Sequence, residues 1–224
     1  MFPGRDLVNR KCIVIAGYEW TNKDIHTRID ERNYVKPDYS FVPPFSPLPG
    51  KRIVVINNKF IRQWPDKYKY PVNYFDRSAL ECLRDLLVRK GYGVVYNHFV
   101  EHIALDEYFE FDDQDIFGKD DNTYDMRELY NSCADAGERN RIQLALFNAS
   151  ELVIGPQGGN LYLPAICRRP IYVLMRAGEY IDYLELGRLY DIKVEVFYEP
   201  RHLVRWIEAE LPQADVGVNK QVVR

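Results

Sequence analysis

The sequence predicts an α/β fold: a Rossmann-like, mostly parallel sheet with helices on both faces, preceded by a proline-rich N-terminal arm. From residue 51 onward, short apolar runs rich in β-branched residues alternate with longer segments whose apolar residues recur at helical spacing. That alternation is typical of βαβ units, in which a helix connects two parallel strands. Before residue 51, five prolines fall within residues 37–49, which excludes a helix or a central strand there.

Strands are predicted where the apolar residues are continuous, because a strand that is buried on both faces has no polar side. These runs are residues 52–57, 94–97, 152–155, 171–175 and 194–197, and another lies in the arm at 11–17.

Helices are predicted at residues 76–91, 126–133, 138–150, 160–167, 181–190 and 200–211. In the first of these, Asp76 or Ser78 can cap the first turn, and Gly91 can end the helix in the left-handed conformation. Pro200 suits the first turn of the last helix. We therefore divide the chain into an arm (1–50), an α/β domain (51–212) and a flexible tail (213–224).

Composition excludes several classes of protein. With 224 residues, 46% of them hydrophobic, and a net charge of -3, the chain is neither disordered nor a basic nucleic-acid binder. No apolar stretch approaches the roughly 20 residues that span a bilayer, and no secretory leader precedes the arm. The four cysteines lack CxxC spacing, and Cys12, Cys82 and Cys167 stand in apolar contexts typical of buried free thiols. These features favour a reducing, cytoplasmic location.

A glycine-rich turn, Gly-Pro-Gln-Gly-Gly-Asn, follows the predicted strand at 152–155. Ligands of parallel α/β sheets bind at the carboxyl ends of strands, and paired glycines let a backbone approach a ligand closely. The predicted helix after the turn would add unpaired N–H groups. The candidate binding residues here are Gly155, Gln157, Gly158, Gly159 and Asn160. A tight turn that needs glycine for its shape alone would give the same pattern. The turn is not GxGxxG and has no Walker lysine, so NAD and P-loop sites are poorly supported.

Polar residues also follow the other predicted strands. Basic and amide side chains there could neutralise a phosphate without a metal, although a solvated loop is the simpler alternative. These candidates are Asn58, Lys59, Arg62, Asn73 and Arg176. Proton transfer to or from a substrate hydroxyl would need a carboxylate or an imidazole. The candidates for that role are Asp76, Glu101 and His102, with His98 on the other side of Glu101.

Ten acidic residues stand between Glu101 and Asp125, and Asp113-Gln-Asp115 resembles the Asp-x-Asp that holds a divalent ion and a nucleotide sugar. Carboxylates at this spacing could bind Mg²⁺ or Mn²⁺. A solvated acidic loop would look the same, and the favoured interpretation includes no metal and no cofactor.

Three segments together resemble a known family. They are Ile56-Asn-Asn-Lys59, Pro71-Val-Asn-Tyr-Phe75 and Phe147 to Asn160 with Pro164. They are similar to the donor-binding, C-terminal domain of GT-B-type glycosyltransferases, closest to the family-61-like group, over about residues 51–210. The resemblance implies a nucleotide-diphosphate sugar donor and a glycan or glycolipid acceptor. It also implies that the Gly155–Asn160 turn cradles the donor while Lys59, Arg62 or Arg176 offsets phosphate charge.

The chain departs from that family at one informative position. Gln157 stands where the group usually has histidine, and an amide cannot act as an acid or base at neutral pH. A GT-B enzyme also has two α/β domains, whereas this chain has room for about one. A partner subunit or a second copy could supply the acceptor side. A non-catalytic α/β ligand-binding or assembly module is the alternative.

Overall fold

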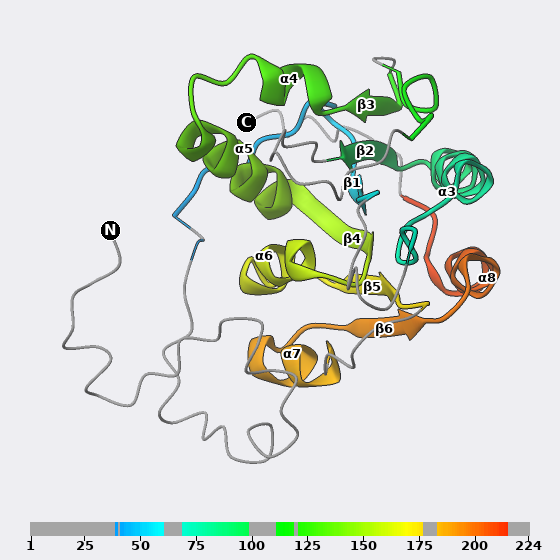
Figure 1. The fold of residues 1–224 in the computed structure, drawn as a ribbon. Helices are drawn as coiled ribbons and strands as arrows, with labels where there is room; N and C mark the ends of the chain where they lie inside the picture. Colours follow the sequence, from blue (N-terminus) through cyan, green and yellow to red (C-terminus); the bar gives the residue numbers. More distant parts are fainter. Residues whose placement is uncertain are drawn as a thin grey trace, which may run out of the picture.

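The computed structural model describes residues 39, 41–60, 69–98, 111–118, 121–176 and 183–214 (Figure 1). Its strands are β1 (Ile53–Asn58), β2 (Gly93–His98), β3 (Thr123–Asp125), β4 (Ser150–Pro156), β5 (Ile171–Leu174) and β6 (Val194–Phe197). Within these residues they form one six-stranded sheet in the order β3-β2-β1-β4-β5-β6. Every pairing is parallel. The predicted α/β fold is confirmed.

Helices cover both faces of the sheet (Figure 1). One face carries α3 (Arg77–Arg89) and α8 (Pro200–Glu210), and the other carries α4 (Arg127–Asn131), α5 (Ala136–Ala149), α6 (Tyr162–Ile166) and α7 (Tyr183–Tyr190). Successive side chains of a strand point to opposite faces, so β1 supplies both cores. Val54 and Ile56 pack toward α3 and α8, while Ile53 and Val55 pack on the other side.

The local signals around α3 are also confirmed. Asp76 is the N-cap, and its Oδ1 accepts a hydrogen bond of 2.9 Å from the amide of Ala79. Gly91 follows the helix with a φ of +86°, a conformation that glycine adopts at low cost.

Three features differ from the sequence expectations. The edge strand β3 was not predicted, because three residues in an acidic segment carry no periodic signal. The short helix expected at residues 160–167 is divided into a 3₁₀ turn, Gly159–Leu161, and the five residues of α6. Cys82 is exposed on α3 rather than buried, whereas Cys167 is buried as predicted. The run at 11–17 lies outside the described residues.

The described ends of the chain pack against the domain. Asn148 on α5 donates to the carbonyls of Tyr39 and Val42, and Leu48 is buried in the core beside that helix. At the other end, the Ala214 amide donates to the carbonyl of Lys90 at 2.7 Å, so the packed chain extends two residues past position 212. Among the described helices, none combines the length and the apolar character needed to cross a membrane.

Candidate functional site

The order of the strands has its switch point between β1 and β4. From this central pair the chain proceeds to β2 and β3 on one side and to β5 and β6 on the other. In such sheets, the connections after the two central strands leave toward opposite faces, and ligands bind where they part. Lys59 follows β1, and residues 157–160 follow β4. The two polar motifs found in the sequence therefore lie side by side at this switch point.

The amino group of Lys59 lies directly above Gly158. A Cβ atom built on Gly158 would be 2.1 Å from Lys59 Nζ and 3.1 Å from its Cε. The φ of Gly158 is +150°, which L side chains rarely adopt. Glycine at this position therefore serves to admit the lysine.

Lys59 is half-buried, and its amino group makes no hydrogen bond or ion pair within the described part of the chain. Loss of hydration disfavours the ammonium form, and burial lowers the pKa of Lys59 to about 7. At neutral pH the group is therefore divided between its charged and neutral forms.

Asn160 presents an unsatisfied acceptor at the same place. Its Oδ1 is buried without a hydrogen-bond partner among the described residues, and it lies 3.4 Å from the Cβ position of Gly158. Beside it, Gly159 is exposed, and a Cβ there would meet nothing within 4 Å. A donor and an acceptor without partners thus border a turn that has open space next to it. Buried polar groups normally have partners, so these two atoms are candidates for contact with a ligand.

A buried chain of side-chain hydrogen bonds supports the turn from below. Tyr130 donates to Asn97 Oδ1 at 2.7 Å, and Asn97 Nδ2 donates to Asn57 Oδ1 at 2.6 Å. Asn57 Nδ2 in turn donates to the carbonyl of Asn160 at 3.3 Å. The sequence analysis missed these three supporting residues. Their signal was an asparagine in each of two neighbouring apolar strands.

Asn73 and Gln157 join the loops rather than face open space. Both are buried, and Asn73 Nδ2 donates to Gln157 Oε1 at 3.3 Å. Asn73 Oδ1 accepts from the Arg176 amide at 2.9 Å. The Gly158 amide donates to the hydroxyl of Tyr183 at 2.9 Å, so this N–H is not free for a phosphate. These contacts fix the loops after β1, β4 and β5 relative to one another.

Two other residues expected to bind substrate have structural partners instead. Asn58 accepts from the Phe75 amide and donates to the Phe75 carbonyl and to Tyr96, which uses its amide within the protein. Gly155 makes room for Leu161 and Asn57, whose atoms would lie 2.9 and 3.0 Å from a Cβ at that position. Both residues hold the framework of the site.

Arg176 and Asp76 form a contact that is partly open to solvent. Arg176 Nη2 is 3.4 Å from Asp76 Oδ2, and the guanidinium lies 5.7 Å from the centre of the Tyr74 ring. Asp76 already caps α3 through its other oxygen, so a role as general base would compete with two existing contacts. Arg62, Glu101 and His102 lie outside the described residues.

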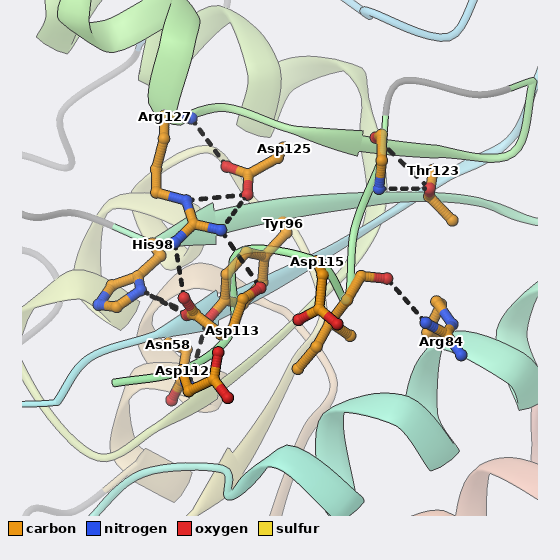
Figure 2. Close-up of polar contacts among 12 residues, drawn as sticks. Asn58, Arg84, Tyr96, His98, Asp112, Asp113, Asp115, Thr123, Asp125 and Arg127 are labelled. Carbon is orange, nitrogen blue, oxygen red and sulfur yellow. Dashed lines mark hydrogen bonds and ion pairs between the residues drawn. The ribbon is translucent and has the colours of Figure 1, made fainter. Parts of the chain in front are cut away.

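A buried charged cluster stands at the end of β2. Figure 2 shows Asp113 among His98, Tyr96 and Arg127. Asp113 is fully buried and accepts from Tyr96 at 2.5 Å, from His98 Nδ1 at 2.7 Å and from Arg127 Nη1 at 2.6 Å. Arg127 also pairs with Asp125.

The pKa values in this cluster follow from these contacts. Burial alone would raise the pKa of Asp113, but the hydrogen bonds and charges of His98, Tyr96 and Arg127 outweigh it and hold that pKa below its usual value. Burial and the neighbouring Asp113 carboxylate raise the pKa of Tyr96 well above its usual value. Asp113 is therefore an anion and Tyr96 a neutral donor at neutral pH.

The two carboxylates of Asp113-Gln-Asp115 have different arginine partners. Asp115 forms a bidentate pair with Arg77, with distances of 2.8 and 2.6 Å, whereas Asp113 pairs with Arg127. Over the ranges that the structure describes, no group of three His, Cys, Asp or Glu side chains is placed to hold a metal ion. The contacts described here thus give no support to the metal-dependent alternative.

No family model and no curated protein matches this chain. Among solved structures, the CMP N-glycosidase BcmB of Clostridium botulinum is similar at 11% identity and a TM-score of 0.34, over 70% of this chain and 98% of that one. A variant of the wall teichoic acid polymerase TagF is similar at 19% identity and a TM-score of 0.36, over 72% of this chain. This chain spans 35% of the TagF length in that comparison. These similarities are distant and assign the chain to no family.

Proposed function

We propose that this chain binds a nucleotide-diphosphate sugar at the β1–β4 switch point and transfers the sugar to a hydroxyl acceptor on a glycan or glycolipid without a metal. The observation that carries the proposal is Lys59, a half-buried amino group without a counter-charge among the described residues, above the Gly158 turn. Burying an ammonium without a partner is costly, and a bound anion would offset that cost. A diphosphate supplies such an anion.

The same lysine would act during the reaction. Negative charge builds up on the diphosphate as the bond to the sugar breaks, and a cation already in place stabilises that charge. Arg176 is exposed at the end of β5 and holds Asp76 only at 3.4 Å, so it can supply a second cation from the solvent side. Asn160 Oδ1 is free to accept a hydrogen bond from a sugar hydroxyl.

Calorimetric titration of the full chain with UDP, GDP and CDP, and with their hexose conjugates, tests the proposal. We expect at least one diphosphate to bind, and Lys59→Met to weaken that binding by about tenfold or more. Lys69→Met is the matched control, since Lys69 is exposed on the loop before α3. Absence of binding to every member of the panel would refute the proposal, as would equal effects of the two variants.

A non-catalytic binding module is the second candidate. The observation in its favour is Gln157, a fully buried amide that holds Asn73 at the position where the resembled family has a histidine. This candidate predicts that donors bind with the same dependence on Lys59 but are never turned over. Release of nucleoside diphosphate from a bound donor therefore separates the two functions. If the chain is a glycosyltransferase, a second copy or a partner subunit could supply its acceptor site.

A further inference from the structure

We propose that His98 is the general base of this site, held in one tautomer by Asp113 and supported by Tyr96 and Arg127. The inference rests on the proposed function for its substrate. In the sequence His98 stands near Glu101, and the pattern there favours His102 for this role.

The hydrogen bonds around Asp113 determine where the proton of His98 lies. Asp113 is an anion, so it can only accept, and its Oδ2 is 2.7 Å from His98 Nδ1. Nδ1 therefore carries the proton in the neutral imidazole, and the lone pair lies on Nε2. In Figure 2 the far side of the His98 ring points away from the carboxylate, and Nε2 has no partner in the part of the chain that the structure describes.

The charges around Asp113 keep the proton of the neutral imidazole on Nδ1. Asp113 and Asp125 share one guanidinium, that of Arg127. The Asp113 and Arg127 side chains are 0% and 20% exposed, so solvent compensates the charges only weakly. The two carboxylates and the single guanidinium give the cluster a net charge of -1 when His98 is neutral. A carboxylate in this setting holds the Nδ1 proton that faces it.

The position of His98 places it at the same edge of the sheet as Lys59. His98 pairs with Asn58 in the parallel register of β1 and β2, and Lys59 is the next residue along β1. Neighbouring strands are about 4.8 Å apart, so the base and the phosphate-binding cation lie on adjacent strand ends.

The step itself is a substitution at the anomeric carbon. The acceptor oxygen forms a bond to that carbon while its proton passes to His98 Nε2. The bond from the carbon to the diphosphate oxygen breaks, and its electron pair leaves with the diphosphate. When water takes the acceptor's place, the same step hydrolyses the donor.

His98→Asn tests this role, because the asparagine amide can occupy the position of Nδ1 and keep the hydrogen bond to Asp113 while Nε2 is lost. With the donor that binds best in calorimetry, we expect the Kd to stay within about threefold while donor hydrolysis falls by about a hundredfold or more. Asp115→Asn is the control, because Asp115 pairs with Arg77 at the surface and should leave hydrolysis unchanged.

A second measurement separates positioning from simple packing. In Asp113→Asn, donor hydrolysis should fall by about tenfold or more while the Kd stays within about threefold, because an amide can donate to Nδ1 as well as accept from it and no longer fixes the tautomer. Unchanged hydrolysis in His98→Asn would overturn the assignment, and so would a wild-type chain that binds donors but hydrolyses none. A wild-type chain that binds no donor would instead refute the proposed function on which the assignment rests.

Discussion

Lys59 Nζ occupies the space that a side chain at Gly158 would take, at 2.1 Å from the Cβ position. The two residues belong to different strand ends, so their contact joins the loops after β1 and β4. The site is therefore sensitive to change at either partner.

Gly158→Ala should destabilise the fold by roughly 1–3 kcal/mol, because the methyl group collides with the lysine and the backbone has a positive φ. Gly159→Ala is the control, since a Cβ there meets nothing within 4 Å. Urea denaturation measures both. In the Lys59→Ala background the penalty at position 158 should shrink but persist, because the collision is removed and the backbone conformation is not. An undiminished penalty would show that the two residues are not in contact.

Lys59→Met should stabilise the protein while it weakens donor binding. The folded pKa of about 7 lies below the ordinary value of 10.5, so the unfolded chain binds more protons between these values. The free energy of unfolding therefore increases with pH between 7 and 10.5, by at most about 1.4 kcal/mol per pH unit. Below pH 7, burial of the charged Lys59 amino group destabilises the fold to its full extent. We expect a gain of roughly 2 kcal/mol at pH 6 and a flatter pH profile above 7. A loss of stability at pH 6 would contradict the assignment of an uncompensated charge.

Diphosphate binding should be coupled to proton uptake. A bound anion raises the pKa of Lys59, so at pH 8 the complex takes up a proton that the free protein lacks. Affinity should consequently decrease as the pH rises above 7. Calorimetry in two buffers of different ionisation enthalpy measures the proton number directly. The Lys59→Met variant, if it retains weak binding, should show no uptake from this position.

Arg127→Leu should be among the most costly single substitutions in the chain, at about 3–5 kcal/mol, because it leaves the fully buried Asp113 without its guanidinium. Arg77→Leu removes an exposed ion pair with Asp115, which solvent screens, and should cost far less stability. Thermal denaturation at neutral pH compares the two. Similar losses in both variants would show that burial of the Asp113 pair has no energetic consequence.

The sequence was sufficient to locate five of the strands in the described sheet, because parallel strands buried on both faces have an unbroken apolar pattern. It missed β3, whose three residues pair with β2 in the middle of an acidic segment. Nothing local in Thr123–Asp125 distinguishes a strand from a loop, and the pairing arises only when β2 is in place.

For the site, the rule that ligands bind at strand ends predicted that the two segments meet, and Lys59 does lie against Gly158. It could not assign roles within them. Asn58 and Gln157 look like ligand-binding residues in the sequence, but in the structure their side-chain amides form hydrogen bonds with Phe75 and Asn73. The partnership of His98 with Asp113 depends on how an irregular segment packs against β2, which no periodicity records. The alternation of Tyr96 and His98 along β2 was the one available clue.

The pairing of β1 with β4 also has a kinetic consequence. Ile53 lies beside Ser150, so the sheet closes at its centre only after β2, β3, α4 and α5 have been formed or bypassed. Such long-range pairing is slow compared with the formation of a helix or a neighbouring βαβ unit. Lys59 and Gly158 meet only across this seam, so partly folded chains should lack the binding site altogether. Retention on an immobilised diphosphate would then select the completely folded molecules, and the retained fraction would measure how much of the chain has folded.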